Sequence, residues 1–222
     1  MSDGLRCRAV FLGAPGAGKG TQAKRLVEEH RVLHVSSGDM LREHRAAGTE
    51  LGQEAQRYMD DGQLVPDELI IAMVLDRISK PDAGSAWILD GFPRTLPQAQ
   101  SLDQSLTAES AVSHVVFFDV PHAILFRRLT GRRTCSNSSC GAIWHTEFNP
   151  TRVEDVCDTC GSNLVQRPDD RSEVVETRLQ EYKSLTEPLL DYYRSRELLI
   201  EVNADQAPDA VLGDVVRALS NP

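Results

Sequence analysis

Short runs of consecutive apolar residues alternate with longer helical stretches along this chain, and no other feature of the sequence limits the fold as strongly. The predicted strands are residues 9–12, 33–35, 87–89, 115–118 and 198–200. Strands that are apolar throughout are buried on both faces, which is typical of parallel sheets covered by helices. We therefore predict an α/β fold: a doubly wound, five-stranded parallel sheet with helices on both faces. In such sheets, ligands bind beyond the carboxyl ends of the strands.

Two segments interrupt the alternation, and both are predicted to be insertions on the ligand side of the sheet. The first insertion, residues 36–65, contains polar helical patterns without a strong strand. The second insertion, residues 131–170, contains four cysteines and many turn residues. At its end, Asp170 is a candidate N-terminal cap for a long helix that carries Val174, Val175, Leu179 and Tyr182.

The stretch from Gly13 to Thr21 (GAPGAGKGT) directly follows the first predicted strand and opens a helix. Glycines allow several backbone N–H groups to point at one anion, and the new helix adds its positive N-terminal end. Lys19 supplies a mobile positive charge for outer phosphate oxygens. A glycine-rich turn without a ligand is the alternative, but the strand, lysine and helix together favour phosphate binding. The phosphate-loop candidates are Gly13, Ala14, Gly16, Ala17, Gly18, Lys19, Gly20 and Thr21.

Gly20 stands where the usual phosphate-loop motif has a serine or threonine that ligates Mg²⁺ directly. A metal ion would then be held mainly by nucleotide oxygens and water, an arrangement that suits Mg²⁺. Asp90, at the end of the third predicted strand, is a candidate for orienting the hydration shell of that ion. Its alternative role is to cap a turn, which is common for aspartate. Its position at the same sheet edge as Lys19 favours the functional interpretation.

Basic residues recur beside the predicted ligand-side loops. Arg94 follows Asp90 in the sequence DGFPR, and Ser37 and Arg42 belong to the sequence SSGDMLR after the second strand. The latter sequence is also an ordinary capped helix start. Four more arginines flank or follow the cysteine segment: Arg128, Arg132, Arg167 and Arg178. Phosphoryl transfer needs such fixed donors because the charge on the transferring group must be neutralised.

The four clustered cysteines are predicted to bind zinc. Cys135 and Cys140 are separated by four residues, Cys157 and Cys160 by two. Two such pairs form tetrahedral Cys₄ sites, and a small polar segment gains from a metal that holds it together. Reduced thiols or disulfides are the alternatives. His145 is a substitute ligand or, more simply, a surface residue, and Cys7 is predicted to be buried.

Net charge argues against a nucleic-acid-binding protein. The 222 residues include 24 Lys and Arg and 33 Asp and Glu, which gives a net charge of −9. Nucleic-acid-binding domains usually carry a basic surface. No apolar run reaches the roughly 20 residues that span a membrane. The first ten residues lack a signal-peptide pattern, so we expect a soluble, cytoplasmic protein without nucleic-acid or membrane partners.

Taken together, these motifs resemble the adenylate kinase family in the family's own order. The matching stretches are GAPGAGKGT, SSGDMLR, LVPDELI, ILDGFPRTLPQAQ, RLTGRR and QRPDD. The resemblance implies a P-loop NTPase-like fold and a monomer that transfers a phosphoryl group reversibly from Mg²⁺-bound ATP to AMP, giving two ADP. It also implies a core domain (1–35, 66–130 and 171–222), an AMP-binding insertion (36–65) and a lid with a four-cysteine zinc knuckle (131–170).

The resemblance also assigns roles to single residues. The implied catalytic residues are Lys19, Asp90, Arg94, Arg128, Arg132, Arg167 and Arg178. ATP would contact the phosphate loop, Arg128, Arg132 and Gln206. AMP would contact Ser37, Arg42, Gln63, Val65, Gly91, Arg94, Gln98, Arg167 and Arg178. Ser37 stands where the family more often has threonine, Gln63 and Gln206 where lysine is frequent, and the first cysteine pair is usually spaced two apart.

Other functions remain as alternatives. A kinase of the same fold would act on UMP, CMP or GMP, although Ser37, Gln98 and the SGDMLR turn favour AMP. A zinc-knuckle nucleic-acid-binding protein with a remnant phosphate loop is disfavoured by the net charge of −9. A P-loop GTPase is weaker still, because the chain has no Asn-Lys-x-Asp string. We expect no catalytic base among the six histidines.

Overall fold

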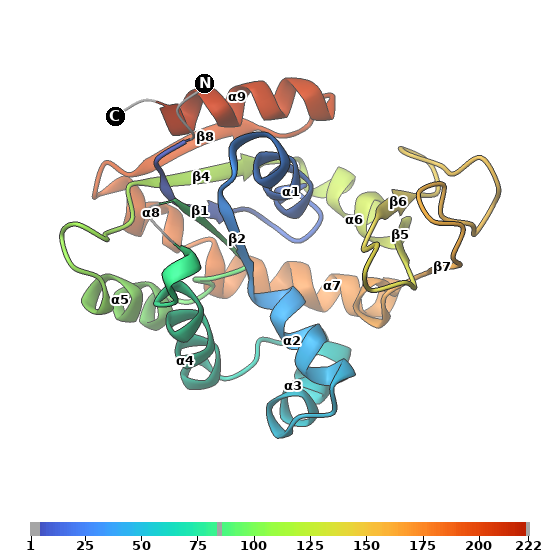
Figure 1. Ribbon diagram of the computed structural model, residues 1–222, viewed down its shortest axis with the longest axis horizontal. Coiled ribbons are helices and arrows are strands. Elements are labelled where there is room, and N and C mark those ends of the chain that lie inside the picture. The colour runs from blue at the N-terminus through green and yellow to red at the C-terminus, as the bar shows by residue number, and fades with distance from the viewer. Residues whose placement is uncertain (1–4, 84–85, 221–222) are drawn as a thin grey trace.

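A five-stranded parallel sheet forms the centre of the molecule (Figure 1). The computed structural model describes residues 5–83 and 86–220; residues 1–4, 84–85 and 221–222 of the predicted core domain lie outside the described part. The strands are β1 (Arg8–Leu12), β2 (Leu33–Ser36), β3 (Trp87–Asp90), β4 (His114–Asp119) and β8 (Leu199–Asn203). Their order is β2-β3-β1-β4-β8, and all neighbours pair in parallel. The predicted sheet is confirmed.

Helices connect the strands and cover both faces of the sheet. They are α1 (Lys19–His30), α2 (Ser37–Ala46), α3 (Glu50–Asp60), α4 (Asp67–Ile78), η1 (Pro81–Ala83), α5 (Leu96–Ser105), α6 (His122–Thr130), η2 (Pro168–Asp170), α7 (Ser172–Glu181), η3 (Tyr182–Thr186), α8 (Leu189–Arg194) and α9 (Pro208–Ser220). The long helix predicted after residue 170 is divided, because its ladder widens into a π-helical turn at η3. Asp170 does not cap that helix: α7 is preceded by Arg171, and Asp170 lies inside the short helix η2.

Alternate residues of β1 pack into two separate cores, one on each face of the sheet. Ala9 and Phe11 contact the cluster that includes α1, α6, α7 and α9, and Val10 and Leu12 contact the cluster that includes α4, α5 and α8. Successive side chains of a strand point to opposite faces, so a central strand must be apolar throughout. Cys7, 1% exposed, belongs to the first cluster, as predicted.

The strand register brings the chemistry-bearing ends together at one edge. Phe11 of β1 pairs with Asp90 of β3, and Asp90 pairs with Ser36 of β2. The phosphate loop after β1, the first insertion after β2 and the DGFPR turn after β3 therefore start side by side.

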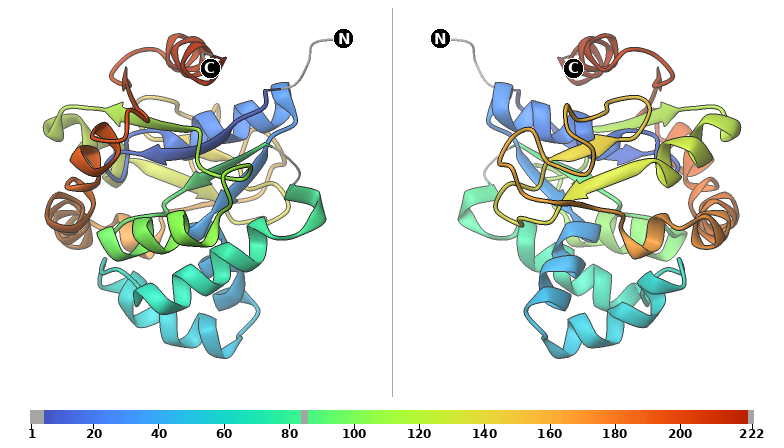
Figure 2. Two further views of the ribbon diagram at one scale, coloured as in Figure 1. Left: turned by 90° about the vertical axis from the view of Figure 1, so that its left-hand side faces the viewer. Right: turned by 90° about the vertical axis from the view of Figure 1, so that its right-hand side faces the viewer.

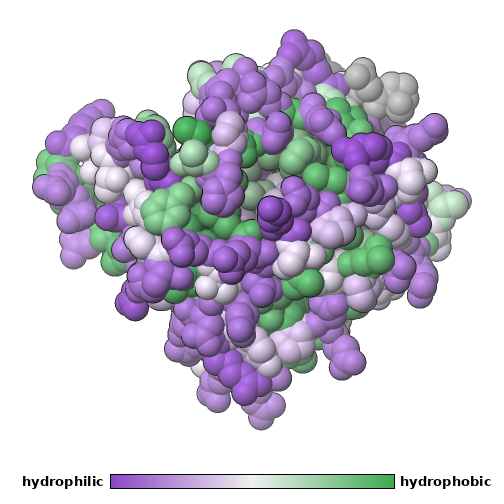
Figure 3. All heavy atoms as spheres, turned by 180° about the vertical axis from the view of Figure 1, so that it is seen from behind, coloured by the Kyte–Doolittle hydropathy of each residue, from purple (hydrophilic) through white to green (hydrophobic). Residues whose placement is uncertain are grey.

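The two insertions leave the sheet as separate lobes, which Figures 1 and 2 show from three sides. The first is helical, formed by α2 and α3. The second is built on a small antiparallel sheet of β5 (Arg132–Cys135), β6 (Ile143–His145) and β7 (Leu164–Val165), in the order β6-β5-β7. Seen from behind, most of the surface is hydrophilic, with hydrophobic residues in patches (Figure 3). Among the described residues, no helix is long and apolar enough to span a membrane.

Candidate active site and cysteine cluster

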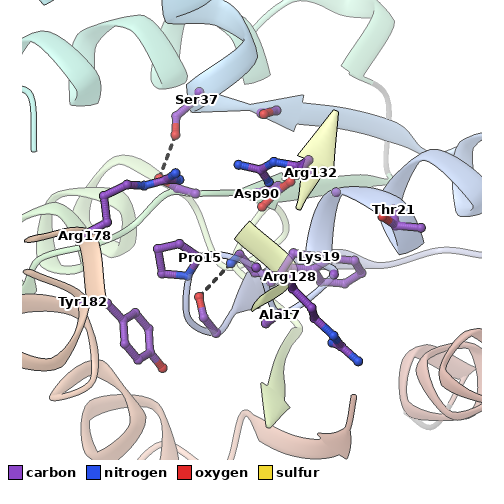
Figure 4. Close-up of a pocket in the computed structure, with 18 of the residues that line it drawn as sticks. Pro15, Ala17, Lys19, Thr21, Ser37, Asp90, Arg128, Arg132, Arg178 and Tyr182 are labelled. Carbon is purple, nitrogen blue, oxygen red and sulfur yellow. Dashed lines mark hydrogen bonds between the residues drawn. The ribbon is translucent and has the colours of Figure 1, made fainter. Parts of the chain in front are cut away.

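One cavity of about 840 Å³ lies between the carboxyl edge of the sheet and the two insertions. All predicted nucleotide-binding residues except Ala14 line it: Gly13, Gly16, Ala17, Gly18, Lys19, Gly20, Thr21, Ser37, Arg42, Gln63, Val65, Asp90, Gly91, Arg94, Gln98, Arg128, Arg132, Arg167, Arg178 and Gln206. Residues far apart in sequence thus share one hollow. Figure 4 shows the phosphate loop, Asp90 and three of the arginines around it.

The phosphate loop holds Lys19 through its own carbonyl groups. The Lys19 ammonium donates to the carbonyl oxygens of Gly13 (2.7 Å) and Ala14 (3.0 Å). Ala14 therefore supports the loop from behind rather than lining the cavity. Burial lowers the pKa of Lys19 to about 8, although the nearby Asp90 carboxylate opposes this shift. Near neutral pH the side chain is therefore still mostly charged.

Asp90 is an ionised carboxylate at the cavity floor. Burial raises its pKa, but the His34 hydrogen bond (Nε2 to Oδ2, 3.3 Å) and the charge of Lys19 outweigh burial, so the net shift is downward. A Cβ added to Gly20 would lie 3.2 Å from Asp90 Oδ2. A serine or threonine side chain at position 20 would therefore crowd the carboxylate. Asp90 lines the cavity.

The turn after β3 brings Ser37 and Arg94 onto one carbonyl group. The Ser37 hydroxyl donates to the Gly91 carbonyl at 2.7 Å, and Arg94 Nε donates to it at 2.8 Å. A Cβ on Gly91 would lie 2.8 Å from Ser37 Oγ and 2.9 Å from Arg94 Nη2, so only glycine allows this approach. Burial lowers the pKa of Arg94 to about 10, which leaves it charged at neutral pH.

Several cavity arginines are held by carboxylates at the base of the second insertion. Asp170 is completely buried and accepts from Arg132 Nε (2.7 Å), Arg132 Nη2 (2.5 Å) and Arg178 Nη1 (3.0 Å). Asp169 lies 3.1 Å from Arg178. Burial would lower the pKa of Arg132, but the charge of Asp170 outweighs burial and raises it.

The remaining arginines are paired or positioned separately. Arg42 donates to Asp39 at 2.6 Å, and Arg128 lies 3.4 Å from Asp205. Burial tends to raise the pKa of Asp39, but Arg42 outweighs burial and lowers it to about 2. Arg167 Nε donates to the Thr134 hydroxyl at 3.0 Å, and burial lowers its pKa to about 10.

The four predicted metal ligands meet in the second insertion. The sulfur atoms of Cys135, Cys140, Cys157 and Cys160 all lie within 4.8 Å of one another. Two of the distances are 3.4 Å (Cys135 to Cys160) and 3.8 Å (Cys140 to Cys157). A tetrahedral zinc site with Zn–S bonds of about 2.3 Å places its sulfurs about 3.8 Å apart, so the cluster fits zinc. No disulfide joins these cysteines.

His145 is engaged elsewhere. Its Nδ1 accepts from the backbone N–H groups of Glu147 (2.9 Å) and Phe148 (3.0 Å), and its Nε2 faces the Arg127 carbonyl at 3.0 Å. Sequence reasoning missed its position in the cavity wall, where it lies with Trp144 and Phe148. The aromatic residues beside the cysteines were the available signal.

Converging guanidinium groups opposite a phosphate loop are what phosphoryl transfer requires, because its charge must be neutralised by groups already in place. The fold and the site therefore define a phosphotransferase of the P-loop class. The sequence model of one family, described as "Adenylate kinase", matches residues 11–198. The chain belongs to the adenylate kinase family.

Individual relatives are similar to this chain over nearly its whole length. The chain is 45% identical over 213 residues to an adenylate kinase of Lachnospira eligens, covering 96% of this chain and 99% of the relative. It is 48% identical over 215 residues to one of Desulfitobacterium hafniense (96% and 98%) and 47% identical over 212 residues to one of Methanothrix thermoacetophila (95% and 97%). The predicted fold class, enzyme class and reaction are confirmed: this is an ATP:AMP phosphotransferase.

Proposed function

We propose that this chain transfers the terminal phosphoryl group of ATP directly to AMP inside one shared cavity, under insertions that close over both nucleotides. The observation that carries this mechanism is the meeting of the phosphate loop, both insertions and six arginines around one hollow of about 840 Å³. That volume lies near the upper end of the range of about 300–1,000 Å³ for small-molecule sites. In the transfer, an oxygen of the AMP phosphate attacks the terminal phosphorus of ATP, and the bond to the ADP oxygen breaks.

The ATP side of the proposal rests on the phosphate loop. Backbone N–H groups between Gly13 and Thr21, except at Pro15, which has none, would hold the ATP phosphates, with Lys19 on their outer oxygens. Arg128, at the end of α6, and Arg132, at the start of the second insertion, would meet ATP from the lid side. The backbone near Gln206 would face the adenine. Gln206 Nε2 donates to Asp214 at 2.6 Å and to the Asn203 carbonyl at 2.9 Å, which supports a role through the backbone.

The AMP side rests on the first insertion and the DGFPR turn. Ser37, Arg42, Gln63, Val65, Gly91 and Gln98 would contact AMP, with the base read partly by the backbone of residues 63–65 and 91. Arg94, Arg167 and Arg178 would hold the phosphate that is transferred. Arg178 is already held by Asp169 and Asp170, so an incoming phosphate would share a guanidinium whose position is fixed in advance.

Mg²⁺ would bind with ATP, held by phosphate oxygens and water, with Asp90 orienting the water. The ionised state of Asp90 and the narrow space at Gly20 support this arrangement. When bound, the ion neutralises phosphate charge. No nucleophilic side chain or histidine base is required. Water must be excluded, because otherwise ATP would be hydrolysed.

The predicted division into core (1–35, 66–130 and 171–222), AMP-binding insertion (36–65) and lid (131–170) belongs to this proposal. Zn²⁺ bound by Cys135, Cys140, Cys157 and Cys160 would hold the lid together. We also propose that the protein acts as a cytoplasmic monomer on ATP, AMP and ADP, without nucleic-acid or membrane partners. The net charge of −9 supports the absence of nucleic-acid binding.

The test is a coupled assay of ADP formation from Mg²⁺ and ATP with AMP, UMP, CMP or GMP, with zinc quantified in the same sample. AMP should be the preferred acceptor. Lys19→Met should lower kcat by about 10²–10³-fold, because it removes a charge that stabilises the transition state. Its circular dichroism and melting should stay close to those of the unmodified protein. Near-normal turnover of the variant would refute the role of Lys19.

A further inference from the structure

The side-chain amide of Gln98 is held from both ends by partners of opposite kind. Gln98 is 2% exposed and lines the cavity. Its Oε1 accepts from the backbone N–H of Arg94 at 2.7 Å, and its Nε2 donates to Asp67 Oδ1 at 2.7 Å. Asp67 begins α4, directly after the first insertion, and does not line the cavity.

These two partners allow a single orientation of the amide. An ionised carboxylate only accepts hydrogen bonds, and a backbone N–H only donates them. Rotating the amide by 180° would set its oxygen against the Asp67 carboxylate and its NH₂ group against the Arg94 N–H. Both hydrogen bonds would be lost in a buried place, where unpaired polar groups are costly.

Asp67 is itself held in place from α5. The Thr95 hydroxyl donates to Asp67 Oδ2 at 2.7 Å and also accepts from the Gln98 backbone N–H at 3.3 Å, where it caps α5. The carboxylate thus bridges the first turn of α4 and the first turn of α5. It fixes Gln98 from behind, on the side away from the ligand.

We propose that Asp67 is a positioning residue that sets base selectivity at the monophosphate site by fixing the orientation of the Gln98 amide. The inference rests on the proposed function, in which Gln98 contacts the AMP base. The choice between purines would then depend on a residue outside the cavity.

The selectivity follows from the hydrogen-bonding pattern of the base. Adenine presents a donor at its 6-amino group and an acceptor at N1. A 6-oxopurine, such as hypoxanthine or guanine, presents an acceptor at position 6 and a donor at N1. After its two protein contacts, Gln98 keeps one acceptor site on Oε1 and one donor on Nε2. An amide that cannot rotate can pair with adenine through both atoms but meets a 6-oxopurine with donor against donor and acceptor against acceptor.

The experiment compares AMP and IMP as phosphoryl acceptors in the full-length protein. Asp67→Ala removes the carboxylate, and Asp67→Asn keeps its size while allowing contact with either end of the amide. Glu68→Gln is the matched control, because Glu68 is exposed in the same helical turn and carries the same charge. For each protein, kcat and KM are measured with both acceptors and with ATP. Dissociation constants of AMP and IMP come from calorimetry.

In Asp67→Ala, the ratio of kcat/KM for AMP to that for IMP should fall about tenfold or more. The KM for ATP should be unchanged, and Asp67→Asn should lie between Asp67→Ala and the unmodified protein. Glu68→Gln should keep the original ratio. If Asp67→Ala fails to fold, Asp67→Asn alone must lower the ratio.

Two results would overturn the inference: an unchanged ratio in both Asp67 variants, or an equal loss of activity on AMP and IMP, which would indicate a purely structural role. Failure of the proposed function would look different. In that case the unmodified protein itself would form no ADP from ATP and AMP.

Discussion

The two insertions border the same cavity but are stabilised in different ways. Three residues of the first insertion, Leu41, Ala55 and Val65, are buried in the same core as residues of β2 and α4. The second insertion has a small cluster of its own, in which the buried residues are Cys135, Cys157 and Leu164. Large hydrophobic residues there remain exposed, among them Val153 (60%) and Phe148 (50%).

This difference shows what a short insertion in a sheet protein needs in order to stay folded. Helices with one apolar face can use the core of the parent domain. A small three-stranded sheet that projects away from that core buries too little apolar surface to be stable by itself, and a metal ion that cross-links it would stabilise it. We therefore expect metal removal to act on the second insertion and core mutations to act on the first.

The largest effect is expected from Cys157→Ser. Losing one of four thiolate ligands should lower zinc content from about one ion per chain toward zero and unfold the second insertion. Metal analysis and amide hydrogen exchange check this, with faster exchange in residues 131–165 and unchanged protection in the central sheet. Ser139→Ala, an exposed change between the first two cysteines, is the control. Unchanged zinc and exchange in Cys157→Ser would show that the cluster is not a metal site.

The next effect is expected at the root of the second insertion. Asp170→Ala leaves the Arg132 and Arg178 guanidinium groups without their fully buried partner. Breaking such a pair should cost about 3–5 kcal/mol of unfolding free energy. Denaturant titration measures this cost. A loss below 1 kcal/mol would mean that the ion pairs do not hold the insertion to α7, and Asp169→Ala gives the comparison with a partly exposed neighbour.

A somewhat smaller effect is expected in the first insertion. Leu41→Ala, at a residue only 5% exposed, should lower the unfolding free energy by about 2–5 kcal/mol. Zinc content should not change, because the two insertions have separate cores. Val153→Ala, in the exposed part of the second insertion, should stay within about 0.5 kcal/mol. Zinc loss in Leu41→Ala would contradict the separation of the two insertions.

The smallest effect is a pH dependence that separates the ATP side from the AMP side. Burial lowers the pKa of Lys19 to about 8, so ATP affinity should fall as pH rises through 8, by up to about tenfold per pH unit. Burial also lowers the pKa of Arg94 and Arg167, but only to about 10, so AMP affinity should hold in that range. The same shift affects folding. The pKa of Lys19 in the folded protein is below its value in the unfolded chain, so the charged form of Lys19 opposes folding at pH 7. The contribution of Lys19 to the free energy of unfolding should therefore rise between pH 8 and about 10.4.

Calorimetry from pH 7 to 9 measures both affinities. Lys19→Arg, which keeps its charge throughout, should remove the slope for ATP. An equal slope for ATP and AMP would assign the effect to a group other than Lys19.

Much of the fold and of the candidate site could be predicted from local sequence patterns. The apolar run at 115–118 predicted a strand buried on both faces, and it lies inside β4. The phosphate loop was recognisable because its glycines and lysine act within a few residues. Interactions between distant segments could not be predicted in this way. Asp67 accepts a hydrogen bond from Gln98, 31 positions further along the chain, and nothing in the sequence near Pro66 indicates that partner.

Asp170 is a second case in which a local pattern was misleading. Its position before a helical pattern predicted a helix cap, but its buried carboxylate forms ion pairs with Arg132 and Arg178. The following helix is also divided, by a π-helical turn at Tyr182–Thr186 that the apolar pattern did not indicate. Local rules describe neighbours along the chain, whereas this site is made by pairs that meet only in three dimensions.

In the proposed mechanism, one cavity holds both nucleotides side by side. The most direct measurement is calorimetric titration with a bisubstrate mimic, in which two adenosines are joined through a chain of phosphates. We expect one molecule of the mimic to bind per chain, more tightly than ATP or AMP alone, and ATP and AMP to lose binding in its presence. AMP that still binds in the presence of saturating mimic would show that the two nucleotides do not share this cavity.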